Sequence, residues 1–350
     1  MIAKFRAIPH SSGEQLCRQT TQAAGKPAFF TRKKRMQVAV LPKKKGVLMK
    51  ISTNTNFAPL LASEADAIRL IRDAGFDCFD LSLFCMVQDD CPYNGPDYLS
   101  RARELRRVAD DCGISCNQSH APFPSSYCND TPEHCEANQK MPDRLRRALE
   151  IAATVGAGTI VVHPKQHLHW TDHAACLMEE NRAFYESLLP LCREYGIRVA
   201  VENMWQRNRY GKGIVDSTCS RPDEFAAYMA MLDPEWFVAC LDIGHCLLTD
   251  HAPADMIRAL GHRHLHALHV HDNDGVADLH TVPFQPNAAR VDWSSVTDAL
   301  AEIDYDGDLT LEVDSFLLRL PRELLPASLK YMAETARYLS NEVERKRKKG

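Results

Sequence analysis

Four acidic or imidazole side chains each end a short apolar run, and they are the residues of this chain best suited to chemistry. Strands buried in a parallel sheet read as such runs, and in a closed parallel barrel the catalytic groups lie at the carboxyl ends of the strands. Oxygen and nitrogen donors that meet at one end of a barrel suit a divalent cation, which indicates an enzyme. The four residues are Glu202, Asp242, His271 and Glu312.

Further polar residues lie close to these predicted strand ends. Gly244 would let the chain turn sharply after Asp242, which would bring His245 back over the end of the barrel. Loops at this end of a barrel often carry binding and catalytic residues. The other candidates end a strand or lie in a loop that follows one, and they are His120, His163, Trp205, Arg207, Asp278 and His280.

Each candidate also has a purely structural interpretation. A strand-end glutamate can face solvent, Asp242 could cap a helix, and a histidine near proline could be a hydrogen-bonded structural residue. Side-chain alternation places His269 and His271 on the same face, and only one or two of the histidines between 262 and 271 should be ligands. The arginines of the loop 205–213 could contact a phosphate, a carboxylate or only water. The strength of the pattern is that all these residues fall at one end of one predicted barrel.

The elements that must position these residues alternate between apolar strand patterns and amphipathic helix patterns. We predict strands over 48–54, 77–83, 114–120, 159–163, 197–202, 236–242, 265–271 and 308–312. We predict helices over 63–75, 98–111, 142–155, 173–195, 221–232, 254–260, 293–303 and 321–340, and a loop over 121–141. Eight such units favour an α/β fold with a single closed (β/α)8 TIM barrel over an open sheet. The glycine patterns of dinucleotide-binding and P-loop proteins do not occur.

Composition and cysteine usage agree with a globular protein. The chain has 350 residues, 45% of them hydrophobic and 25% charged, and one barrel typically needs about 250 residues. The 13 cysteines are scattered without a CxxC pair, which favours reduced thiols and a cytoplasmic location over a disulfide framework. No apolar run approaches the roughly 20 residues of a membrane-spanning helix, so membrane insertion is not expected.

Charge is distributed unevenly along the chain. Residues 1–46 contain eleven Lys and Arg against Glu14, a balance of +10, and residues 341–350 have a balance of +3. Because the whole chain has a formal charge of −4, residues 47–340 carry −17. We therefore expect a basic, disordered extension over 1–46, the barrel over 47–340 and a basic tail over 341–350. Met49 opens the first strand pattern, and an inert extension or an early start of the reading frame is favoured over a nucleic-acid-binding arm, because basic runs alone are weak evidence for such an arm.

Several motifs together resemble the xylose isomerase-like TIM-barrel superfamily and, within it, the sugar phosphate isomerase/epimerase group. The resemblance covers about residues 49–340 and depends on the order and spacing of the motifs. They are Ser119-His120-Ala-Pro-Phe, Val161-Val-His163-Pro, Val201-Glu202-Asn-Met, Leu241-Asp242-Ile-Gly-His245, His269-Val-His271-Asp-Asn-Asp274, Asp278-Leu-His280 and Leu311-Glu312.

The resemblance implies a role for each matched residue. Glu202, Asp242, His271 and Glu312 correspond to the single divalent metal site of ketose 3-epimerases and related isomerases, where the two glutamates also move protons. His245 corresponds to a substrate-contacting histidine. In this chemistry a cation bound to a carbonyl and its neighbouring hydroxyl stabilises the enediolate that forms when a carboxylate removes a carbon-bound proton. The oxygen-rich ligand set suits Mn²⁺, Mg²⁺ or Co²⁺, and Zn²⁺ also accepts it.

The same motifs also resemble endonuclease IV, a three-zinc DNA-repair enzyme of this superfamily. That resemblance adds His120, His163, His245, Asp278 and His280 to the four residues above, which makes nine possible metal ligands, and it makes phosphodiester hydrolysis the main alternative. Against it stands the charge of −17 on residues 47–340, since DNA binding depends on neutralising phosphates with Lys and Arg. The loop between His271 and Asp278 is also shorter than expected for that enzyme.

We therefore expect a metal-dependent isomerase or epimerase that acts on a sugar or keto-polyol by proton transfer through Glu202 and Glu312. A dehydratase or lyase on a keto-polyol would share the first step, and a barrel that only binds sugars would keep the ligands without turnover. The expected partner is a small-molecule substrate, a homo-oligomer is one option, and nucleic acid is not expected. The substrate would contact His245, His120, His163, Trp205, Arg207 and His280.

Overall fold

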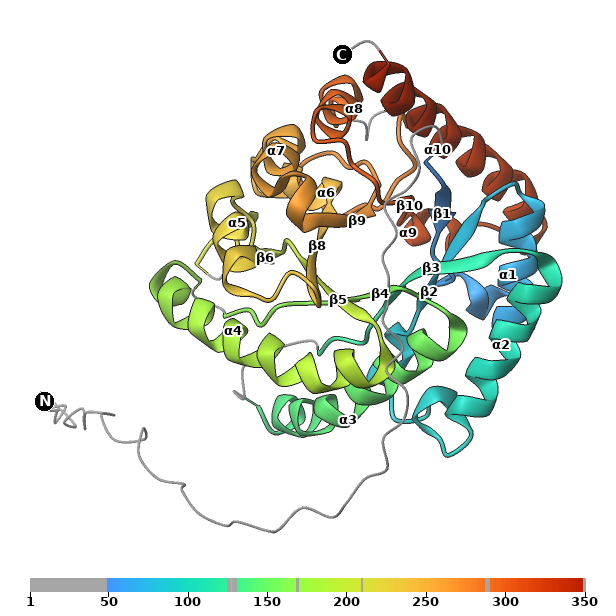
Figure 1. Ribbon diagram of the computed structural model, residues 1–350, viewed down its shortest axis with the longest axis horizontal. Coiled ribbons are helices and arrows are strands. Elements are labelled where there is room, and N and C mark those ends of the chain that lie inside the picture. The colour runs from blue at the N-terminus through green and yellow to red at the C-terminus, as the bar shows by residue number, and fades with distance from the viewer. Residues whose placement is uncertain are drawn as a thin grey trace, which may run out of the picture. The chain divides into compact units, whose positions relative to one another are not determined.

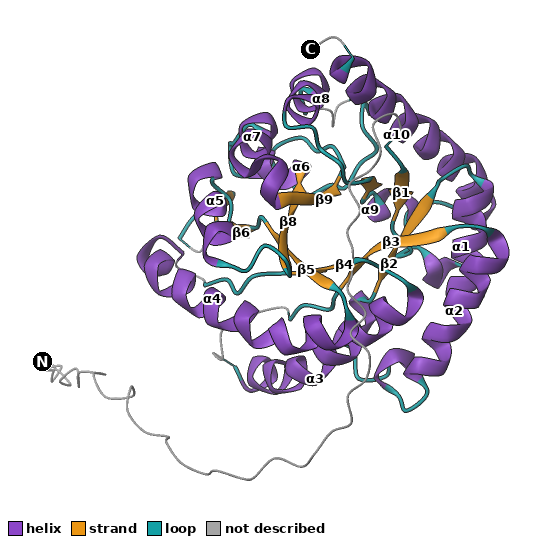
Figure 2. Ribbon diagram, viewed as in Figure 1, coloured by secondary structure: helices purple, strands orange, loops and turns teal. Residues whose placement is uncertain are grey.

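Parallel strands close into a ring. The computed structural model describes residues 49–124, 127, 131–167, 170–208, 210–286 and 290–348. In these ranges one sheet has the order β2, β3, β4, β5, β8, β9, and β1 pairs with β10. Bridges from Asn54 to Asp80 and from Val270 to Leu311 join the two sheets at both edges, which gives the closed ring of Figure 2. Its strands are β1 (Ile51–Thr53), β2 (Cys78–Ser82), β3 (Ser115–His120), β4 (Thr159–Val162), β5 (Arg198–Glu202), β8 (Phe237–Asp242), β9 (Leu265–His269) and β10 (Leu309–Leu311).

Helices surround this ring on the outside (Figure 1). Local signals set their ends: Ser63 Oγ accepts a hydrogen bond from the Asp66 N–H at the start of α1, and Gly113 is left-handed, with φ 68°, where α2 ends. The main helices are α1 (Glu64–Asp73), α2 (Tyr98–Cys112), α3 (Pro132–Val155), α4 (Trp170–Tyr195), α5 (Pro222–Met231), α7 (Pro253–His264), α8 (Trp293–Glu302) and α10 (Leu325–Arg347). Across the described ranges, none of the helices is both long and apolar enough for a bilayer crossing.

The predicted (β/α)8 barrel is confirmed, but several element boundaries differ. α3 begins at Pro132 rather than 142, because Thr131 Oγ1 accepts a hydrogen bond from the His134 N–H and caps the helix there. Part of the predicted loop 121–141 is therefore helical. α10 continues to Arg347, past the barrel boundary predicted at 340. The predicted basic extension over 1–46 lies outside the described residues.

Short elements decorate the carboxyl ends of three barrel strands, and they were not predicted. An antiparallel hairpin of β6 (Trp205–Arg207) and β7 (Ile214–Asp216) follows β5. The short helix α6 (Ile243–Leu248) follows β8, and α9 (Asp314–Leu317) follows β10. Elements this short show too few residues for a periodic pattern, so sequence periodicity does not detect them.

Small apolar side chains fill the inside of the ring below the strand ends. The larger core lies between the strands and the helices, where Tyr185 and Phe237 are buried and Tyr185 Oη donates to the Val162 carbonyl at 2.8 Å. Because the interior is packed, the polar residues at the carboxyl ends of the strands lie on a floor that is largely apolar, with buried Asp80 as a polar exception 3.9 Å from His269 Nε2. The inner cluster consists of Val161, Ala200, Val238, Cys240 and Ala267.

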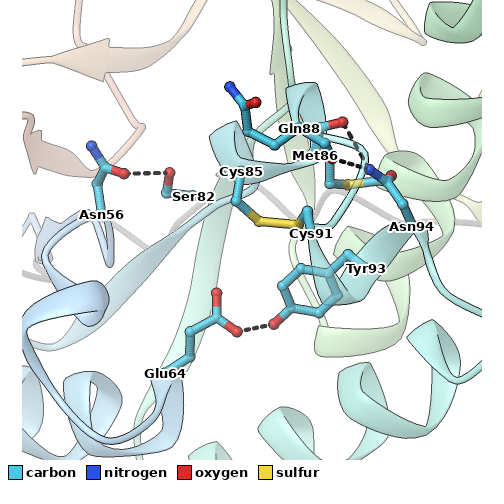
Figure 3. Close-up of a disulfide and its surroundings, with 9 residues drawn as sticks. All are labelled: Asn56, Glu64, Ser82, Cys85, Met86, Gln88, Cys91, Tyr93 and Asn94. Carbon is cyan, nitrogen blue, oxygen red and sulfur yellow. Dashed lines mark hydrogen bonds between the residues drawn. A yellow bond between two sulfur atoms is a disulfide. The ribbon is translucent and has the colours of Figure 1, made fainter.

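A disulfide joins Cys85 and Cys91 in the segment after β2 (Figure 3). Asn94 braces the same segment, because its Nδ2 donates to the carbonyls of Met86 and Gln88 at 3.0 and 2.7 Å. The prediction of reduced thiols is wrong for this pair. The spacing of the two cysteines matches no motif, so only the turn that brings them together reveals the pairing.

Candidate metal centre

The ends of four barrel strands bring together a buried group of possible metal ligands. Glu202 is the last residue of β5, Asp242 of β8 and His269 of β9, and Glu312 directly follows β10. One donor atom of each lies within 4.8 Å of the others, and none of the four residues is more than 5% exposed. These four residues are called the central group below.

The donor set of the central group fits a divalent cation. Glu202 Oε2 is buried, and its near neighbours among the described residues are two imidazoles, His163 Nε2 at 2.9 Å and His120 Nε2 at 3.5 Å; a carboxylate that stays ionised at such depth needs positive charge nearby. A bound cation would compensate for that charge. Three carboxylates and one imidazole form an oxygen-rich set of the kind that Mn²⁺, Mg²⁺, Co²⁺ or Zn²⁺ accepts.

The structure places His269, rather than His271, in the central group. The Nδ1 atom of His269 lies 2.6 Å from Glu202 Oε1 and 3.1 Å from Glu312 Oε2, so this imidazole links the two glutamates. His271 lies beyond the end of β9, where its Nε2 is 2.9 and 3.0 Å from the two Asp242 oxygens. His269 therefore adjoins the two glutamates, and His271 adjoins Asp242. The predicted role of His271 as a metal ligand stays a proposal.

A second group of possible ligands lies at the rim of the barrel. It consists of His245, His271, Asp278 and His280, with donor atoms within 4.8 Å of one another, and is called the rim group below. His245 Nε2 is 3.6 Å from Asp278 Oδ2, and His280 Nε2 is 3.2 Å from Asp278 Oδ1. The ring of His271 stacks on that of His280 at 4.1 Å.

Two local features of the chain hold the rim group in place. Asp242 Oδ1 accepts a hydrogen bond from the His245 N–H at 2.7 Å and caps α6, so Asp242 has the structural role considered from the sequence as well as its place in the central group. Gly244 leaves room for a ring: a Cβ atom there would lie 2.0 Å from Cε1 of His271. The turn at Gly244 thus brings His245 to the rim and leaves space there for the His271 ring.

His120 and His163 form a third group with Glu202. His163 Nε2 lies 2.9 Å and His120 Nε2 3.5 Å from Glu202 Oε2. Phe123 stacks on the His163 ring at 4.2 Å. All nine positions that the resemblance to endonuclease IV implied as metal ligands therefore meet at one end of the barrel.

Burial and neighbouring charges separate the pKa values of the two glutamates. Burial raises the pKa of Glu312. Burial acts in the same direction on Glu202, but His269 and His163 outweigh it and hold the pKa of Glu202 well below its usual value. Two carboxylates whose environments push their pKa values apart are typical of a base and an acid in one site. Burial also lowers the pKa of His163 to about 4, so this imidazole is neutral at pH 7.

Asn203 braces the site and was not predicted. Its Oδ1 accepts from the Asp242 N–H at 2.7 Å, its Nδ2 donates to the Asp242 carbonyl at 3.0 Å, and its own carbonyl lies 2.8 Å from His245 Nδ1. These bonds tie the ends of β5 and β8 together. A polar residue directly after Glu202, inside an otherwise apolar stretch, is the only signal that the sequence offered.

A cavity of about 530 Å³ opens above the three groups. Phe84, Phe123 and Trp205 form aromatic parts of its wall, and Gln166 and Ser315 add neutral polar groups. Among the described residues that line it there is no Lys or Arg. Trp205, predicted as a substrate contact, lines the cavity, as do His120, His163, His245 and His280, whereas Arg207 does not and is exposed.

Comparison with known proteins identifies the family. The family model described as "Xylose isomerase-like TIM barrel" matches residues 68–335, so the chain belongs to that family. A curated relative, the uncharacterized protein y4fM of Sinorhizobium fredii, is 25% identical over 283 residues, which is 72% of this chain and 82% of y4fM.

Solved structures of similar fold include sugar epimerases. A D-tagatose 3-epimerase-like protein superposes with a TM-score of 0.62 at 21% identity, over 84% of this chain and 99% of that protein. A D-psicose 3-epimerase, solved in the presence of D-fructose, gives 0.60 at 16% identity, over 83% and 99%. At these identities the similarity establishes the shared fold.

Proposed function

We propose that the protein is a divalent-metal-dependent isomerase or epimerase of a sugar or keto-polyol, and that it works by proton transfer at the central group. The observation that carries this proposal is the pair Glu202 and Glu312, which His269 links and whose pKa values are displaced in opposite directions. The pair lies directly below a cavity that can hold a small substrate. The epimerase structures of the same fold support the proposal.

The two glutamates have complementary roles in the proposed reaction. Glu202, kept ionised by its histidine neighbours, removes a proton from the carbon next to a carbonyl. Glu312, whose pKa is raised, delivers a proton. Delivery to the opposite face of the same carbon gives epimerisation, and delivery to the neighbouring carbon gives isomerisation. His269, in contact with both carboxylates, keeps them aligned across the substrate.

The metal would be held by Glu202, Asp242 and Glu312 together with His269 or His271. When bound, a divalent ion supplies positive charge beside the substrate oxygens on which negative charge develops. Asn203 fixes the Asp242 backbone, and the apolar floor of the barrel keeps bulk water away from the donors from below. The nature of the metal, among Mn²⁺, Mg²⁺, Co²⁺ and Zn²⁺, is part of the proposal.

The cavity wall favours an uncharged, polyhydroxylated small molecule over a phosphorylated one or DNA. Aromatic faces such as those of Phe123 and Trp205 can stack on the apolar face of a sugar ring, and His245 can contact a hydroxyl group. The described lining contains no Lys or Arg that could form a bidentate or point-charge contact with a phosphate. A cytoplasmic location and a small-molecule partner belong to the same proposal.

A trinuclear phosphodiester hydrolase is the second candidate, because the rim group and the His120–His163 pair add ligands that a single-metal enzyme does not need. Deuterium incorporation separates the two. In D₂O, the metal-loaded protein should place deuterium at a ketose carbon and leave a phosphodiester such as bis-p-nitrophenyl phosphate intact. Cleavage of the phosphodiester without exchange into any ketose or keto-inositol would favour the hydrolase instead.

A further inference from the structure

Trp205 connects the β6–β7 hairpin to the rim group. Its indole Nε1–H donates to Asp278 Oδ2 at 3.2 Å. The backbone of Trp205 is itself fixed, because Gln166 Nε2 donates to its carbonyl at 2.9 Å and to Ser217 Oγ, on the other side of the hairpin, at 2.9 Å. The hydrogen bonds from Gln166 hold the backbone of Trp205 in place, and its indole N–H points at the carboxylate of Asp278.

Asp278 depends on such support more than the other members of the rim group. It is the only carboxylate of that group, and it lies in the loop between Asp272 and Thr281, which an isolated antiparallel bridge closes. Its side chain is 21% exposed, whereas His245 is 7% exposed. A partly exposed carboxylate on a loop can turn toward water unless another group holds it.

In the described part of the chain, the Asp278 carboxylate meets three polar side chains. Two of them, His245 and His280, approach through the Nε2 atoms that would face a cation. The third is the indole of Trp205, which has one N–H and cannot bind a metal. When His245 and His280 turn their nitrogens to a cation, the Trp205 contact is the one that still orients Asp278.

We infer that Trp205 is a positioning residue for a divalent cation in the rim group, and that it acts by holding Asp278 in ligand geometry. The inference rests on the metal centre of the proposed function, but it concerns a different group of ligands. It also makes the β6–β7 hairpin a structural requirement for that cation. Hydrogen-bonded partners of metal ligands typically change metal affinity about 10- to 100-fold when they are removed.

Titration of the chelator-treated full-length protein with Co²⁺ tests the inference. Calorimetry and visible absorption follow Co²⁺ binding, which should occur in two steps: a central step, at the central group, and a rim step, at the rim group. The step that a His280→Gln variant weakens is the rim step. Trp205→Phe keeps an aromatic ring and loses the N–H donor, so it should weaken the rim step about 10- to 100-fold and leave the central step unchanged. Trp236→Phe, at the opposite end of β8, is the matched control and should alter neither step.

Fluorescence gives a second readout that does not require a folded Trp205 variant. Co²⁺ in the rim group should quench Trp205, so the quenching at the rim step should persist in Trp236→Phe. A rim affinity in Trp205→Phe within twofold of the parent, or a rim step without quenching, would overturn the inference. A parent protein that binds Co²⁺ only in the central group would also overturn the inference and would leave the proposed function intact. A parent protein that binds no Co²⁺ at all would overturn the proposed function.

Discussion

The central group and the rim group contain the same kinds of ligand, but different parts of the fold hold them. Three members of the central group end barrel strands and the fourth directly follows one, and all are buried. The rim group takes His245 from a short helix, and Asp278 and His280 from a loop. His280 even has a left-handed backbone, with φ 46°, a conformation that costs a non-glycine residue energy.

The difference shows that strand ends and loops of a barrel hold metal ligands in different ways. Strand ends are fixed by the ladder of backbone hydrogen bonds and tolerate a buried cluster of charge, so they suit the reacting groups. Loop residues need side-chain braces such as Trp205 and space such as that over Gly244. We therefore expect substitutions at strand ends to remove activity without unfolding the barrel. Substitutions at the rim should weaken metal binding by the rim group more than metal binding by the central group.

The largest effect should come from the two glutamates of the central group. Glu202→Gln or Glu312→Gln keeps the shape of the side chain and removes its charge, so turnover should fall by about 10²–10⁴-fold or more. Steady-state assay on the best ketose substrate measures it, and circular dichroism checks the fold. Glu334→Gln, at an exposed position on α10, serves as the control. A Gln variant with parental turnover would refute the proton-transfer roles.

A steric change should affect the rim group more than the central group. Gly244→Ala would place a Cβ atom 2.0 Å from the His271 ring, so the ring must move away from Asp242 and His280. Overpacking of this kind costs about 1–3 kcal/mol, and the rim Co²⁺ step should weaken more than the central one. Gly158→Ala meets nothing within 4 Å and should leave both unchanged. Equal weakening of the two steps would contradict the distinction between the groups.

Stability of the metal-free protein should depend on pH in opposite ways at two histidines. Burial lowers the pKa of His245, but Asp242 and Asp278 outweigh it and raise this pKa to about 10. The charged His245 imidazole therefore stabilises the folded state fully below pH 6.5, and this stabilisation is lost as the pH rises toward 10. The pKa of His163 is lowered to about 4, so its contribution is present above pH 6.5 and lost as the pH falls toward 4.

Urea unfolding at a series of pH values measures both contributions. His245→Gln should flatten the decline of the unfolding free energy on the alkaline side, and His163→Gln should flatten the decline on the acid side. An unchanged alkaline slope in His245→Gln would show that Asp242 and Asp278 do not stabilise the charged imidazole.

The smallest effect on the site should come from the disulfide. Cys85→Ser removes the link to Cys91, and closing a short loop contributes about 2 kcal/mol to stability in chain-entropy terms. The unfolding free energy should fall by about that amount, while the Co²⁺ affinities of both groups stay the same. Peptide mapping under non-reducing conditions checks the pairing, and recovery of both cysteines as free thiols would contradict it.

Much of the site could be predicted because its residues end strong apolar patterns. Glu202, Asp242 and Glu312 follow buried strands, and the barrel itself follows from the alternation of strands and helices. The choice between His269 and His271 could not be predicted, because both lie on one face of a strand that alternates with period two. Their separation along the strand, roughly 7 Å, places one among the glutamates and the other at the rim, and only the packed barrel reveals which.

The hairpin and the braces lay beyond sequence reasoning for a different reason. β6 and β7 are three residues each, too short for a clear alternation, so the segment 205–213 read as a loop. Contacts such as that of Trp205 with Asp278 join residues far apart in the chain. They become visible only when the loops of the barrel mouth are folded against each other.

The metal content of the purified, desalted protein tests the central claim most directly. Elemental mass spectrometry should find a tightly held divalent ion in the parent protein, and that ion should be missing from Glu202→Gln and Glu312→Gln but retained in Trp205→Phe. A parent protein that remains free of divalent metal after incubation with Mn²⁺, Mg²⁺, Co²⁺ and Zn²⁺ would contradict the assignment of the central group as a metal centre.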